Sequence, residues 1–112
     1  MVKKSQYRGL FPGALELMIL QTVRRKPMHG YALAQHIKAI SDELLEIEEG
    51  SLYLALQRML KAGWLKSEMG TSAQNRPVRV YKLTTAGAKR LQEERSSVER
   101  MFAGITRVLE TT

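Results

Sequence analysis

The C-terminal part of the chain carries an apolar stripe that is longer than a domain of this size can cover. Residues 85–110 are predicted to form one helix, and about 25 helical residues measure roughly 37 Å. A domain made from the rest of the chain has a smaller radius, so the far end of this helix should project beyond it. The stripe consists of Leu91, Val98, Met101, Phe102, Ile105, Val108 and Leu109. We therefore expect residues 85–112 to be a C-terminal dimerisation helix, separate from a domain formed by residues 1–84.

Apolar spacing in residues 1–84 predicts three helices followed by a β-hairpin. The helices are expected at about 13–25, 30–41 and 50–62, and the strands at 64–69 and 78–84. Residues 70–77 are polar and rich in turn formers, so they should form the hairpin tip. A short extended segment is expected at 44–48. The predicted fold is mostly α with a small β-hairpin, a winged helix-turn-helix followed by the C-terminal helix.

The charge distribution indicates an anionic partner. The chain has 112 residues, a formal net charge of +7 and no cysteine. Residues 1–41 carry +6, residues 42–49 carry −5, residues 50–90 carry +7 and residues 91–112 carry −1. Positive charge therefore gathers on the predicted winged helix-turn-helix, which suits a nucleic acid. The acidic strip 42–49 would weaken DNA binding if it faced DNA, so we expect it to face away.

The predicted third helix and hairpin supply the candidate DNA contacts. Helical spacing turns Leu52, Ala55, Leu56 and Met59 inward and leaves the opposite face polar. A polar helix face can enter the major groove, where Gln57 could bond an adenine edge and Arg58 a guanine or a phosphate. The candidate contacts are Ser51, Tyr53, Gln57, Arg58 and Lys61 on the helix, with Arg76 and Arg79 in the hairpin.

Each of these residues also has a simpler structural interpretation. Tyr53 could be half-buried against the second helix, and Ser51 could only cap its turn. Gln57 and Arg58 could belong to a solvated helix face. The whole module could bind an acidic protein partner, with DNA affinity only incidental.

The pattern argues against several other classes of protein. The two histidines lack a third ligand at metal spacing, so no metal or other cofactor is expected. No nucleophile–base arrangement or phosphate-binding glycine loop is present, so we do not expect an enzyme. No apolar run approaches the length of a membrane span, and the final helix lacks the basic face of a membrane-surface helix. We expect a cytoplasmic protein.

The first and last helices are the candidates for a two-fold dimer interface. The predicted helix 13–25 is apolar on nearly every side, which indicates burial on more than one side. The expected interface residues are Leu15, Met18, Ile19, Val98, Met101, Phe102, Ile105, Val108 and Leu109. A symmetric dimer implies a near-palindromic DNA site. A small-molecule effector, if one exists, would bind between the subunits near Met18 and Phe102.

Several segments resemble the PadR family of transcriptional regulators. They occur in the family's order and spacing over about residues 13–92, and they are Met28–Leu33, Glu49–Tyr53, Leu56–Met59, Lys61–Leu65 and Arg79–Thr84 with Gly87. Leu54 stands where the family commonly has proline, and the single Trp, Trp64, lies outside the final helix. With one helix after the hairpin, the chain resembles the short-form subgroup. The resemblance implies a dimeric, DNA-binding repressor that an effector releases.

Overall fold

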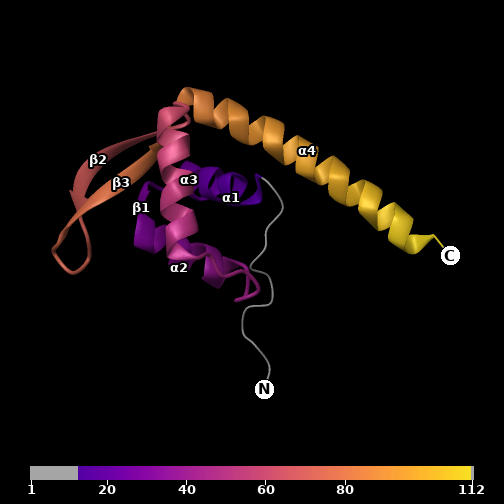
Figure 1. Ribbon diagram of the computed structural model, residues 1–112, viewed down its shortest axis with the longest axis horizontal. Coiled ribbons are helices and arrows are strands. Elements are labelled where there is room, and N and C mark those ends of the chain that lie inside the picture. The colour runs from indigo at the N-terminus through magenta and orange to yellow at the C-terminus, as the bar shows by residue number, and fades with distance from the viewer. Residues whose placement is uncertain (1–12, 112) are drawn as a thin grey trace, which may run out of the picture.

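A computed structural model describes residues 13–111, so the part of the predicted 1–84 domain before Gly13 lies outside the described residues. Four helices and three short strands follow one another along the chain (Figure 1). Their bounds are α1 Ala14–Arg25, β1 Met28–His29, α2 Gly30–Ile40, α3 Glu49–Lys61, β2 Leu65–Thr71, β3 Pro77–Leu83 and α4 Thr85–Glu110. The predicted winged helix-turn-helix with a C-terminal helix is confirmed.

Local signals in the sequence set the ends of these helices. Gly63, at φ 82°, follows α3, and the next amide, that of Trp64, donates to the carbonyl of Met59 at 3.0 Å. This is the Schellman closure that a left-handed glycine permits. Thr84 caps the start of α4, because its Oγ1 accepts from the amide of Gly87 at 2.9 Å. The same hydroxyl donates to the carbonyl of Gly63 at 2.6 Å, so one side chain joins the end of α3 to the start of α4.

The strands form a three-stranded antiparallel sheet in the order β1-β3-β2. In the β2–β3 hairpin, Leu65 pairs with Leu83, Ser67 with Tyr81 and Met69 with Arg79. The sequence did not predict β1, whose two residues pair with Tyr81 and Val80 of β3. Within the expected extended segment 44–48, Leu45 forms an isolated β-bridge and no longer strand is present.

The core lies where α1, α2 and α3 meet the base of the sheet and the first turns of α4. The inward set predicted for α3, Leu52, Ala55, Leu56 and Met59, is fully buried, as are Ile19, Leu20 and Leu33. Along α4, Leu91 is the last fully buried residue, and every residue from Glu99 to Glu110 is exposed. Figure 1 shows the hairpin and the far end of α4 extending from opposite sides of the helical body.

Candidate nucleic-acid interface

The outward face of α3 presents the residues that the sequence predicted as contacts. Burying one side of the helix exposes the other, so Ser51, Tyr53, Gln57, Arg58 and Lys61 all lie at the surface. Leu54, whose side chain is 64% exposed, lies among them. This face is therefore polar and basic, with a single large apolar residue near its middle.

The tip of the β2–β3 hairpin is a compact turn that carries Arg76. The amide of Ser72 donates to the carbonyl of Arg76 at 2.8 Å, and the amide of Arg76 donates to Ser72 Oγ at 3.2 Å. Asn75 adopts a φ of 62°, a left-handed conformation that asparagine tolerates better than most residues. The strands extend further than predicted, which shortens the connecting segment to residues 72–76.

Arg79 lies on the face of the hairpin that also carries the buried Tyr81. Its Nη1 donates to Ser67 Oγ on β2 at 2.9 Å, and this hydrogen bond holds the side chain against the sheet. Lys82 alternates to the opposite face, where it pairs with Glu68. That contact, first by hydrogen bonding and then by charge, lowers the pKa of Glu68. The hairpin therefore presents Arg79 on one face and a neutralised pair on the other.

A groove of about 440 Å³ brings the start of α2, the first half of α3 and the hairpin together. Its lining includes His29, Tyr53, Arg76 and Arg79, and no acidic residue lines it. In particular, no residue of the acidic strip 42–49 lines this groove. Groups from three separate elements of the described chain thus face one concave, positively charged surface.

Tyr53 contacts the start of α2 and is also exposed in the groove. A Cβ placed on Gly30 would lie 3.1 Å from Tyr53 Cε1, so glycine leaves room for the ring. The Tyr53 side chain nevertheless remains 44% exposed. The contact with α2 agrees with the packing interpretation, and the exposed part of the residue lines the groove.

Arg58 forms an ion pair that was not predicted from the sequence. Its Nη2 donates to Glu16 Oε2 on α1 at 2.7 Å. The Arg58 side chain is 60% exposed and that of Glu16 is 22% exposed. The two residues are 42 positions apart, and no local spacing rule connects them.

The residues predicted for a dimer interface divide into three groups by their exposure. Met101, Phe102, Ile105, Val108 and Leu109 are exposed along α4, with Val108 and Leu109 more than 70% exposed. Leu15, Met18 and Val98 are half-buried. Ile19 needs correction, because it has no exposed surface and lies in the core of the single chain.

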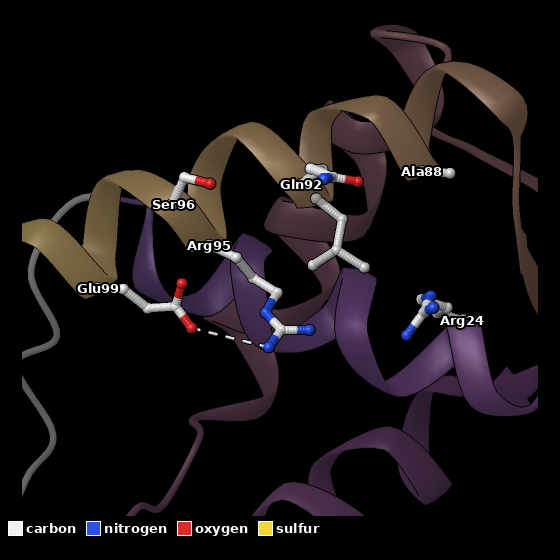
Figure 2. Close-up of a pocket in the computed structure, with 7 residues that line it drawn as sticks. Arg24, Ala88, Gln92, Arg95, Ser96 and Glu99 are labelled. Carbon is white, nitrogen blue, oxygen red and sulfur yellow. Dashed lines mark ion pairs between the residues drawn. The ribbon is translucent and has the colours of Figure 1, made fainter.

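Two cavities lie between α4 and the helices beneath it. An apolar groove of about 510 Å³ is lined by Met18 of α1, Ile37 and Ile40 of α2, and Val98 and Phe102 of α4, among others. A neighbouring polar pocket of about 330 Å³ contains Arg24 of α1 with Gln92 and Ser96 of α4 (Figure 2). Arg95 and Glu99 line both cavities, and their side chains approach to 3.7 Å.

Nothing in residues 13–111 suits a metal ion, because no three His, Asp or Glu side chains converge there. Within the same range, no helix is both long and apolar enough to cross a bilayer.

Comparison with known proteins gives consistent matches to one family. A sequence model of the PadR-like family of transcriptional regulators matches residues 19–93. Among solved structures, a transcriptional regulator from Clostridium thermocellum is 27% identical, with a TM-score of 0.78 over 85% of this chain and 89% of that one. A PadR family transcriptional regulator from Eggerthella lenta is 28% identical, with a TM-score of 0.75 over 89% and 85% of the two chains. A Streptococcus mutans protein is 30% identical, with a TM-score of 0.74 over 91% and 94%.

Proposed function

The chain belongs to the PadR-like family of transcriptional regulators, and on that premise we propose that it is a sequence-specific, dimeric DNA-binding repressor. Family membership indicates a DNA-binding regulator rather than an enzyme. The observation that carries the finer proposal is the groove in which the start of α2, Tyr53 of α3 and two arginines of the hairpin face one surface without an acid. A recognition helix beside a basic hairpin suits a major groove flanked by phosphates.

The two elements are proposed to have different tasks on DNA. Gln57 and Lys61, on the exposed face of the second half of α3, are proposed to face the base edges, and Tyr53 and Ser51 lie toward the start of the helix. Arg76 and Arg79 of the hairpin contact phosphates, which position the protein without reading sequence. Specificity therefore depends mainly on α3, and the salt dependence of affinity depends mainly on the hairpin.

The proposed dimer joins the exposed half of α4 to the apolar groove of a second copy. Each large apolar side chain contributes about 1.5–3 kcal/mol when fully buried. Met101, Ile105, Val108 and Leu109, counted in both chains, supply an amount comparable to an association cost of about 4–15 kcal/mol. Two-fold symmetry then calls for a near-palindromic operator. An effector that releases DNA would bind by α1 and α4, near Met18 and Phe102.

Fluorescence anisotropy with two duplexes at two salt concentrations tests DNA recognition. The protein's own upstream DNA should bind about a thousandfold more tightly than a shuffled duplex. Gln57→Ala should reduce this preference, because one good base contact is worth about 1–3 kcal/mol. Equal binding to both duplexes, with affinity collapsing as salt rises, would instead favour a module for an acidic protein partner.

A matched pair of variants tests the contribution of the hairpin. Arg79→Gln and Lys66→Gln each remove one positive charge, from opposite faces of the sheet. Arg79→Gln should weaken binding to every duplex. It should also reduce the steepness of the salt slope, the slope of log affinity against log salt concentration, by about 0.9. Lys66→Gln should change the slope much less. Equal effects would mean that only net charge matters.

Sedimentation equilibrium tests the dimer. Ile105→Glu places a charge within the exposed apolar stripe, and Ala103→Glu places one on the opposite side of α4. The first should yield monomers at concentrations where the second remains dimeric. Dimers of unchanged affinity in Ile105→Glu would disprove the role of this stripe.

A further inference from the structure

The Glu16–Arg58 pair joins the first turn of α1 to the recognition helix. Arg58 Nη2 and Glu16 Oε2 lie 2.7 Å apart, a short charge-assisted hydrogen bond. Glu16 is the only acid in residues 1–41, a stretch that holds seven bases. The only acidic side chain of that stretch is thus paired with an arginine of α3, the helix proposed to enter DNA.

The pair lies at the edge of the α3 surface that faces outward. Arg58 is seven residues, or about two turns, after Ser51, so the two share one side of the helix. Tyr53 lies on the other side, toward the hairpin and its groove. An arginine at the edge opposite the hairpin is placed to meet phosphates rather than base edges.

Folding stability explains only part of this arrangement. The Glu16 side chain is 22% exposed, but most of the Arg58 side chain is in solvent, and a pair with one such exposed partner contributes modestly to stability. A carboxylate beside an exposed arginine has a larger effect on anion binding, because a phosphate must displace it or approach it against charge repulsion.

We propose that Glu16 withholds Arg58 from the DNA backbone and so limits the affinity of the protein for DNA of every sequence. This inference depends on the proposed function. A free Arg58 would add one phosphate contact to every DNA sequence alike, which raises affinity without discrimination. Glu16 removes that contact from every duplex and leaves base reading by α3 unchanged. The ratio of specific to nonspecific affinity therefore stays the same, while binding to both kinds of DNA is weaker and more easily reversed.

A double-mutant cycle measured on a scrambled-sequence duplex tests the proposal. Wild type, Glu16→Gln, Arg58→Gln and the double variant are titrated by anisotropy over a range of salt. Glu16→Gln should bind about three- to tenfold more tightly, with a salt slope steeper by about 0.9, the value of one further phosphate. Arg58→Gln alone should change affinity less than twofold, because its charge is already withheld. The double variant should lose the gain.

Glu93→Gln is the matched control, since it removes an exposed acid from α4. It should leave the slope within about 0.2 of wild type, because it frees no phosphate contact. On a duplex selected from a random library by the wild-type protein, Glu16→Gln should tighten binding by the same factor as on the scrambled duplex, so the ratio of specific to nonspecific affinity stays unchanged. Thermal unfolding should show that each variant remains folded, with a stability within about 1 kcal/mol of wild type.

Four results would overturn the inference. If Glu16→Gln tightens binding equally with and without Arg58, Glu16 acts only through the overall field. If Glu16→Gln weakens binding, the carboxylate orients Arg58 onto DNA instead of withholding it. If wild type binds selected DNA and Glu16→Gln changes nothing, this inference alone fails. Absence of any DNA binding by the wild type would overturn the proposed function, and the inference with it.

Discussion

Replacing Gly87 by alanine tests the packing that fixes α4 to the rest of the fold. A Cβ at this position would lie 3.0 Å from the Trp64 carbonyl carbon and 2.8 Å from Leu83 Cδ1, and still closer to the Trp64 carbonyl oxygen. That oxygen belongs to the backbone and also accepts a hydrogen bond from the Thr84 amide at 3.2 Å. The first turn of α4 must therefore move away, which strains the helix cap.

The expected magnitude follows from three opposing terms. Overpacking of a tight contact costs about 1–3 kcal/mol. Weakening the Thr84 cap costs up to about 2 kcal/mol. Alanine recovers about 1 kcal/mol of helix propensity relative to glycine. Together these terms give a net loss of about 0–4 kcal/mol, and the central value of about 2 kcal/mol lowers Tm by roughly 8–16 °C for a domain of this size.

Thermal and urea unfolding followed by circular dichroism, at one fixed protein concentration, measure this loss. Gly50→Ala is the matched control, because Gly50 is also helical and a Cβ there would meet nothing within 4 Å. It should be as stable as wild type or more stable by up to about 1 kcal/mol. If Gly87→Ala unfolds at or above the wild-type midpoint, close approach of α4 to Trp64 does not constrain this position.

Three further substitutions test the core, the cap and a buried phenol. Leu56→Ala should cost about 2–5 kcal/mol in urea unfolding because the side chain is fully buried, whereas Leu54→Ala, at an exposed position on the same helix, should change stability by less than about 0.5 kcal/mol. Thr84→Ala should cost about 0.5–2 kcal/mol by the same measurement, and no loss would mean that its hydroxyl does not stabilise α4. Burial raises the pKa of Tyr81 above its usual value of 10.0, so folding favours the protonated phenol. Wild type should therefore lose stability as pH rises past about 10, and Tyr81→Phe should show a smaller loss in pH-dependent unfolding.

Much of the fold was predictable because its signals are local. The apolar spacing of Leu52, Ala55, Leu56 and Met59 predicted which side of α3 is buried. Gly63 and Thr84, two residues with strong local preferences, mark where α3 ends and α4 begins. The prediction of a polar turn in the hairpin is also confirmed, since turn-forming residues end strands whatever the tertiary context. For the candidate site, the sequence predicted the exposed face of α3 and the two hairpin arginines. Contact of these residues with DNA remains a prediction.

Other features depended on residues that are distant in the sequence. β1 exists because Met28 meets Tyr81 across the sheet, and its two residues carry no strand signal of their own. Arg58 is neutralised by Glu16 because α1 crosses beside α3, which no spacing within α3 could show.

The first helix, α1, shows most clearly which features local sequence predicts and which depend on tertiary packing. Its sequence is apolar on nearly every side, so periodicity could predict a helix but could not tell which side faces inward. The packing of α2, α3 and the sheet decided this: it buried Ile19, Leu20 and Val23 in the core and left Met18 in the groove beside α4. Local patterns determined which segments are helical, whereas only the tertiary arrangement determined which apolar residues remain available to a second molecule.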